Sequence, residues 1–263
     1  MGSSYKKDCT DPVDRKEEDL ISIIPKDRKT PYEVHHILEM ILDKESFFEI
    51  GNGYGRSLVI GLGRLDGFSV GILANNCNFD GGAVTAKAAE KMTRFVDLCD
   101  TFNIPVVNFV DNPGFLIGLQ AEESGVIRSG VRALFSVFQA TTPWISIITR
   151  RVFGVAGAGH ANTDGLNLRY AWPSGDWGSL PIEGGVMAAY KRDIQSSPDP
   201  AARQKEIEDS LNHVRSPFRT AEMFGIEEII DPRETRPILC DWVKKTYKNL
   251  PHQLGIKHRT VRP

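Results

Sequence analysis

The chain has 263 residues, of which 41% are hydrophobic and 25% are charged, and its formal net charge is −2. This composition is ordinary for a soluble globular protein, and the length permits one large or two small domains. The small net charge gives no general attraction to nucleic acid or anionic lipid, and no apolar run approaches the roughly 20 residues that cross a bilayer. The chain also begins without a basic and apolar leader, so we expect a soluble intracellular protein with no nucleic-acid or membrane partner.

The cysteines and histidines give no sign of a metal site. The four cysteines are widely spaced and form no C-x-x-C pair, which favours buried, reduced thiols: Cys9, Cys77, Cys99 and Cys240. The six histidines show no zinc-ligand spacing. We therefore expect no metal in this chain.

Order is expected to begin after a polar N-terminal segment. Residues 1–28 are rich in charged side chains and are interpreted as an arm or linker, which leaves residues 29–263 as one domain. Thr30, Pro31 and Glu33 form a capping-box pattern that predicts a helix running to about Asp43.

A hairpin and a helix are predicted next. Apolar runs at 57–64 and 68–74 flank Asp66-Gly67, which is a strong hairpin signal. From 86 to 102, apolar residues recur at steps of three and four, which indicates one buried helical face.

Two buried strands then alternate with helices. Residues 104–110 and 144–149 read as strands, each followed by a loop rich in glycine at 111–118 and 150–159. The helix between them should turn four apolar side chains inward: Ile127, Val131, Leu134 and Phe138. This order predicts parallel strands with helices outside, and ligands in such α/β sheets bind beyond the carboxyl ends of the strands.

The remaining segments predict smaller elements. Short strands are expected at 170–173 and 226–230, and helices at 186–194, 201–213 and 236–249.

The two glycine-rich loops are the places where chemistry is expected. Glycine lets the backbone approach a ligand closely, and the start of a following helix leaves N–H groups that can stabilise an oxyanion. A tight turn at 111–118 and close helix packing at 152–159 are the structural alternatives. No G-x-x-x-x-G-K-[ST] motif is present, and 154–159 does not match G-x-G-x-x-G in register. Arg150 and Arg151 could bind CoA phosphates or a partner's carboxylate, or could simply be solvated, and His160 could orient a ligand or be structural.

Five collinear segments resemble the β subunits of acyl-CoA carboxylases of the propionyl-CoA and methylmalonyl-CoA type. Residues 104–118 resemble the family's "NIP…VD-x-PGF-x-x-G" pattern, and residues 125–130 resemble its "GII-R-x-G". The other three matches are 143–154 to "P-x-x-x-x-ITRKAYG", 170–173 to "YAWP", and 229–236 to "II-x-P-x-x-TR". The resemblance is to the C-terminal, biotin-facing half of these carboxyltransferases.

The resemblance implies an α/β fold of the crotonase-like (ClpP/crotonase) type, with a ββα spiral core and outer helices. It implies transfer of CO2 from carboxybiotin to the α-carbon of an acyl-CoA. The backbone N–H groups of Val155 and Ala156, after Gly154, would face the biotin ureido oxygen. Five further residues would line the biotin and substrate pocket: Pro113, Gly114, Phe115, Gly118 and Gly157.

The resemblance also implies partners. Biotin would be carried on a biotin carboxyl carrier or biotin carboxylase subunit, and a second carboxyltransferase half would bind the acyl-CoA. A homo- or hetero-oligomer is expected, in the cytoplasm or in the mitochondrial matrix of a eukaryote.

The chain departs from the family pattern near the expected site. Val155 follows Gly154 where relatives often have a second glycine, and Ala158 replaces an acidic residue. Two alternatives therefore stay open, namely an acyl-CoA decarboxylase, biotin-linked or biotin-independent, and a non-catalytic structural half of the assembly.

Overall fold

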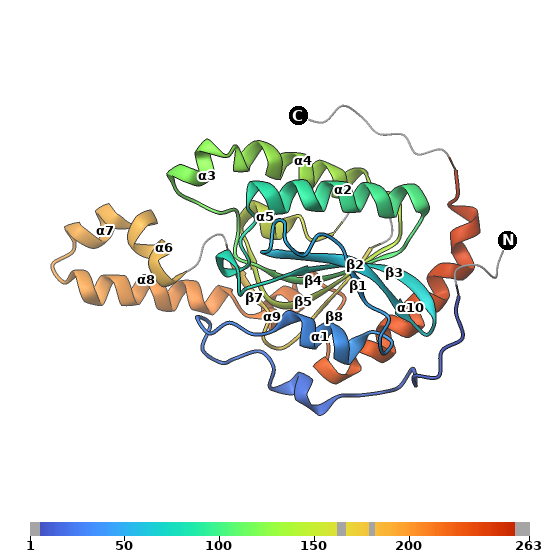
Figure 1. Cartoon of the computed structure of the whole chain (residues 1–263). Coiled ribbons are helices and arrows are strands. Elements are labelled where there is room, and N and C mark those ends of the chain that lie inside the picture. The colour runs from blue at the N-terminus through green and yellow to red at the C-terminus, as the bar shows by residue number, and fades with distance from the viewer. Residues whose placement is uncertain (1–5, 162–166, 179–181, 256–263) are drawn as a thin grey trace.

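The computed structural model describes residues 6–161, 167–178 and 182–255. Within these ranges an eight-stranded sheet lies between two layers of helices (Figure 1). The strands pair in the order β1-β2-β3-β4-β5-β6-β8, and β7 pairs with the far end of β5. Their bounds are β1 Phe48–Glu49, β2 Leu58–Leu65, β3 Phe68–Asn75, β4 Val106–Asn112, β5 Trp144–Phe153, β6 Asn167–Ala171, β7 Asp176–Gly178 and β8 Glu228–Ile229.

The predicted hairpin and parallel strands are confirmed. β2 and β3 are antiparallel and are joined by Asp66 (φ 48°) and Gly67 (φ 78°), whose positive φ angles suit a two-residue hairpin turn. From β3 onward the pairings with β4, β5 and β6 are parallel. β4 and β5 run past their predicted ends, so both predicted loops begin inside strands.

One helical layer covers the face that leads to the expected site. It contains α2 Ala86–Phe102, α3 Leu119–Glu123, α4 Val126–Gln139 and α5 Gly154–Ala158. The predicted bounds of α2 are confirmed, and the Thr85 side chain caps its start by accepting the N–H of Ala88 at 3.0 Å. α2 packs along α4 above β3 and β4 (Figure 1).

The predicted inward face of α4 is wrong at Ile127, which is half exposed, while Val131, Leu134 and Phe138 are only partly buried. The buried side chains of this helix are Val126, Gly130, Ala133, Ser136 and Val137. Small residues dominate this face because α4 packs closely on its neighbours: a Cβ at Gly130 would lie 2.2 Å from the Phe115 ring.

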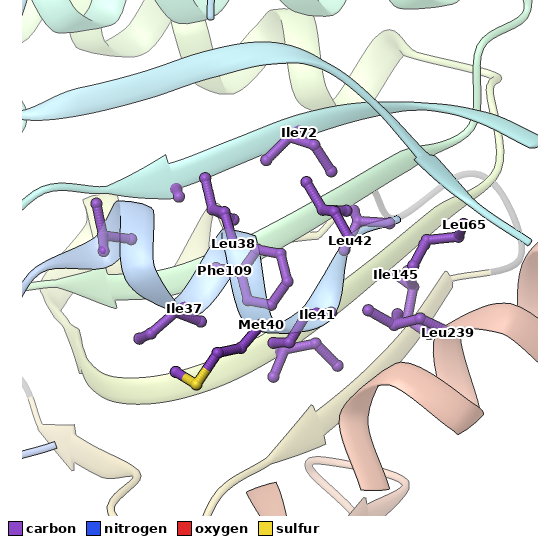
Figure 2. Close-up of a cluster of buried hydrophobic side chains, with 14 of the residues drawn as sticks. Ile37, Leu38, Met40, Ile41, Leu42, Leu65, Ile72, Phe109, Ile145 and Leu239 are labelled. Carbon is purple, nitrogen blue, oxygen red and sulfur yellow. The ribbon is translucent and has the colours of Figure 1, made fainter. Parts of the chain in front are cut away.

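The opposite face of the sheet is covered by α1 Val34–Ile41 and α10 Thr235–Asn249. Figure 2 shows the main core there, in which α1 contributes Ile37, Leu38 and Ile41 beside Phe109 of β4. The predicted start of α1 is wrong. Glu33, rather than Thr30, is the N-cap, and its carboxylate accepts the N–H of His35, whereas the Thr30 hydroxyl donates to Asp27.

Four helices lie between β7 and β8 in the chain, and those within residues 182–214 project to one side of the sheet (Figure 1). They are α6 Ile182–Ala189, α7 Lys191–Ser196, α8 Pro200–Val214 and α9 Pro217–Glu222. The single helix predicted at 186–194 is instead two helices, because Tyr190 (φ −110°, ψ 19°) leaves helical geometry. None of the helices in the described ranges is long and apolar enough to span a membrane.

The N-terminal segment runs along the outside of the α1 and α10 layer (Figure 1). Leu20, in the 3-10 helix η1 Glu18–Ile21, is buried in the main core. Arg15 donates to the carbonyls of Met40 and Leu42, both at 2.8 Å, at the C-terminal end of α1. The remaining 3-10 helices are η2 Asp80–Gly82, η3 Pro232–Glu234 and η4 Leu250–His252.

Candidate active site

The site is built where β4 and β5 end side by side. Asn112 pairs with Val152 across the two strands after a shift in register. The chain then enters the loop at 113–118 from β4 and the short helix α5 from β5. Both predicted loops therefore lie at the carboxyl edge of the parallel strands.

The first turn of α5 presents backbone donors. Gly154 takes a positive φ of 60°, which turns the chain abruptly from strand into helix. The N–H groups in the first turn of a helix have no acceptor inside that helix. Among the described residues we find no other hydrogen-bond acceptor for the N–H groups of Val155 and Ala156.

The two residues that carry these donors differ in exposure. The Val155 side chain is 68% exposed, whereas Ala156 is buried and packs with Val84, Ala89 and Ala133. α5 is thus anchored on one side and open on the other. Gly157 lies against the strand, where a Cβ would come within 2.7 Å of the Val152 carbonyl carbon, so it allows α5 to pack closely on β5.

Asn112 joins the two loops, and the sequence motifs did not single it out. Its Nδ2 donates to the carbonyl oxygen of Ala156 at 3.0 Å, and its Oδ1 accepts the N–H of Gly114 at 2.9 Å. One buried amide therefore fixes α5 relative to the turn after β4. In the sequence, the position of Asn112 directly before Pro113-Gly114 signals only a turn.

The loop at 113–118 is held as a wall beside α5. Val84 donates its N–H to Gly114 O at 2.9 Å and accepts from the N–H of Leu116 at 3.0 Å. Phe115 fits over Gly130 of α4 and lines a small cavity of about 30 Å³ together with Ala156. Pro113 faces a separate cleft, and Gly118 (φ 117°) is the N-cap of α3.

Asp111 anchors this end of the sheet through two arginines. Its carboxylate accepts from Arg150 Nη2 at 2.8 Å and from Arg151 Nε at 2.6 Å, and Asp111 and Arg150 are almost fully buried. The alternative of solvated arginines is therefore wrong. Burial alone would raise the pKa of Asp111, but the hydrogen bond and charge of Arg151, together with Arg150, hold it below its usual value.

His160 lies under α5 and lines the small cavity. Its Nδ1 donates to Gly157 O at 2.8 Å, so the ring supports the end of α5. Its Nε2 is buried with no hydrogen-bond partner in the described structure. Burial lowers the pKa of His160, and the nearby charge of Arg169 acts in the same direction.

No group of three or more His, Cys, Asp or Glu side chains in the described ranges could hold a metal ion. The site instead contains two main-chain N–H donors, at Val155 and Ala156. The aromatic ring of Phe115 lies beside α5, and the amide of Asn112 holds α5 in place. Such donors can stabilise negative charge on an oxygen as it develops during a reaction.

Comparisons with known proteins identify the family of the chain. The model of the carboxyl transferase domain matches residues 3–260. The carboxyltransferase subunit of propionyl-CoA carboxylase from Haloferax mediterranei is 36% identical, over 95% of this chain and 49% of that protein. The α subunit of methylmalonyl-CoA decarboxylase from Veillonella parvula is 32% identical, over 97% of this chain and 49% of that protein.

A solved structure of a carboxyltransferase is also similar to this chain. The hexameric transcarboxylase 12S, with methylmalonyl-CoA and methylmalonic acid bound, superposes with a TM-score of 0.85 at 30% identity, covering all of this chain and 49% of that one. The crotonase-like α/β fold is therefore confirmed. The chain spans about half the length of these relatives, which fits the expected C-terminal half. It belongs to the carboxyl transferase domain family.

Proposed function

We propose that this chain is the biotin-facing half of a carboxyltransferase that moves CO2 from carboxybiotin to the α-carbon of an acyl-CoA. The observation that carries the proposal is the pair of N–H groups at Val155 and Ala156, which have no acceptor in the described structure. They lie at the carboxyl end of β5, in a family of carboxyl transferases.

The residues present fit a biotin ring. Two adjacent amide donors suit the ureido oxygen, and Phe115, which lines a cavity together with Ala156, offers apolar surface. When bound, carboxybiotin supplies the carboxyl group. The chain's own residues hold the oxygen that gains charge, with Asn112 keeping Ala156 in place and Gly157 letting α5 pack closely on β5.

A second half is needed to hold the acyl-CoA, since the chain covers only 49% of the relatives reported above. We propose that this half and a biotin-carrying subunit are the partners, in an oligomer, and that the assembly works in the cytoplasm or the mitochondrial matrix. The hexamer of the transcarboxylase 12S supports an oligomer for this family.

The direct test is reconstitution. The chain is mixed with an acyl-CoA-binding half, carboxylated biotin carrier and propionyl-CoA, and carboxyl transfer to the CoA ester is followed. Transfer that requires this chain supports the proposal. Inactivity despite stable assembly would mean that the chain is a structural half.

The donors are tested by proline substitution, which removes the N–H. Val155→Pro and Ala156→Pro should each lower the rate of transfer by about 100- to 1000-fold, the usual effect of losing one oxyanion donor. Val155→Ala is the matched control, because it keeps the N–H and trims only an exposed side chain. If both proline variants remain folded by circular dichroism and transfer at the control's rate, the role of these amides is wrong.

A decarboxylase is the second candidate, because the Veillonella relative is named as one. In the same assembly, loss of CO2 from methylmalonyl-CoA without any acyl-CoA acceptor would favour it. The donors at Val155 and Ala156 would serve that reaction equally, so only the product distinguishes the two.

A further inference from the structure

A cleft of about 400 Å³ lies toward the β1 edge of the sheet, between α2 and β2. One face of α2 supplies four lining residues at helical steps of three and four: Lys91, Arg94, Phe95 and Leu98. The others come from β2 and from the loop that precedes it: Ile50, Gly51, Tyr54 and Ile60. None of these described residues lines the cavity under α5, so the cleft is separate from the candidate active site.

Lys91 brings a buried positive charge to this cleft. The residue is 5% exposed, and its Nζ donates to the carbonyl oxygen of Leu58 at 2.7 Å. A Cβ at Gly51 would lie 3.8 Å from Lys91 Cε, so the loop before β2 covers the end of this side chain. Among the residues that the structure describes, no carboxylate lies within the 4.0 Å of an ion pair with this ammonium.

Glu49 is the acidic residue whose charge acts on Lys91, but it is engaged elsewhere. Its carboxylate is hydrogen-bonded to His35 Nε2 at 2.9 Å. Burial lowers the pKa of Lys91 below its ordinary value, and the charge of Glu49 opposes this shift without restoring it. The buried ammonium therefore lacks a close counter-ion.

A lysine in this position is unusual. Lysine is seldom buried without a charged partner, because the ammonium loses its hydration. An ammonium has three N–H donors, and the Leu58 carbonyl occupies one of them. Two donors thus stay available for an anion that enters the cleft.

The rest of the inner lining is apolar. Ile60 and Phe95 are buried in the core between the sheet and the helices, and Ile50 and Leu98 pack against that core. A ligand that enters would therefore meet one buried cation and a hydrophobic surface.

The mouth of the cleft does not itself select an anion. Arg94 and Tyr54 are exposed there, and the Tyr54 hydroxyl donates to Glu90. The exposed charges of Arg94 and Glu90 are opposite in sign and are screened by solvent. Selection of an anion therefore depends on Lys91.

We propose that this cleft binds a carboxylate with an aliphatic tail, the carboxylate on the Lys91 ammonium and the tail against the apolar lining. The volume lies in the range of about 300–1,000 Å³ that is typical of small-molecule sites. A carboxylate would accept charge-assisted hydrogen bonds from the available donors, and the tail would be removed from water. The site does not depend on carboxyl transfer, so it can be right or wrong independently of the function proposed above.

The test is calorimetric titration of the chain with octanoate. Lys91→Met should weaken binding about 10- to 100-fold, because it keeps an unbranched side chain but removes the charge-assisted contact. Lys244→Met is the matched control, since it removes the same charge from an exposed position of α10 on the other face of the sheet. It should change binding less than about twofold.

Two further probes separate the contributions of the charge and the tail in the wild-type chain. Octan-1-ol has the same tail without the charge, so it should bind about 10- to 100-fold more weakly than octanoate and equally to Lys91→Met. Butanoate keeps the charge and should bind at least about tenfold more weakly than octanoate, because each buried methylene contributes roughly fourfold.

Circular dichroism shows whether the variants remain folded. If Lys91→Met does not fold, the comparison of octanoate with octan-1-ol on the wild type decides by itself. The proposal is overturned if octanoate does not bind saturably, if octan-1-ol binds as tightly, or if folded Lys91→Met and Lys244→Met bind octanoate alike.

Discussion

His160 shows how one buried side chain supports the site from below. Its ring donates to Gly157 at the end of α5, and its own carbonyl accepts from Asn108, Trp144 and Ser146. Burial favours the neutral ring, and protonation in the folded state is therefore resisted.

This burial predicts a pH dependence of stability. Because the pKa of His160 is lowered on folding, the unfolded chain takes up a proton first, below about pH 6.5. The free energy of unfolding should fall as the pH drops from there toward the folded pKa. Urea unfolding at several pH values should show a smaller fall in His160→Gln than in the wild type.

His35 is the control for this experiment. Burial alone would lower its pKa, but its hydrogen bonds to Glu33 and Glu49 raise it, so its contribution is present at low pH and is lost as pH rises through the folded pKa. His35→Gln should therefore steepen the fall on acidification. Equal slopes in wild type and His160→Gln would contradict the role of His160.

At the scale of elements, α4 sets the position of the Phe115 ring. Gly130→Ala would place a methyl group 2.2 Å from the Phe115 ring, so the ring or the helix must move. We expect a loss of stability of about 1–3 kcal/mol, as is usual for overpacking, and weaker binding of the biotin carrier. Urea unfolding measures the loss of stability, and titration with the carrier measures the change in binding.

Gly53→Ala provides the comparison, because a Cβ there meets nothing within 4 Å. It should leave stability nearly unchanged and carrier binding intact. Retained stability and binding in Gly130→Ala would mean that the Phe115 ring can move at little cost and that its position does not shape the site.

The elements that the sequence predicted well are those with a regular pattern and a local signal. α2 follows from its apolar spacing, to which the structure adds the cap at Thr85, and the hairpin follows from Asp66-Gly67. The ends of β4 and β5 were missed because Asp111 and Arg150 look like polar loop residues. Their mutual ion pair, formed by residues 39 positions apart, is what lets the strands continue.

The same limit applies to the site. The glycine-rich loops and the family resemblance placed the donors of α5 at a strand end. The contact between Asn112 and Ala156 spans 44 positions in the sequence and has no periodicity, so only the folded chain reveals it.

At the scale of the whole molecule, Arg236 of α10 connects segments from distant parts of the chain. This buried guanidinium donates to Pro12 O, Ile41 O and Asp43 Oδ1, each at 2.9 Å. It therefore links the N-terminal segment and the end of α1 to the last helix.

Arg236→Met should destabilise the fold by about 3–5 kcal/mol, because it leaves buried carbonyls and a carboxylate without their donor. Urea unfolding measures the loss. Arg233→Met is the matched control from the same segment: its ion pairs with Asp231 and Glu18 are exposed, so we expect little change. A similar small effect for both variants would mean that Arg236 does not hold the segments together.

The use of main-chain donors in the first turn of α5 has one more consequence. The groups that we propose to act are peptide N–H groups, which every residue except proline possesses, and their direction is set by the turn at Gly154 and the amide of Asn112. Side chains at the mouth can therefore diverge without altering the donors. Val155 is such a divergence, so a change of this kind should reshape which molecules enter while the reaction itself is preserved.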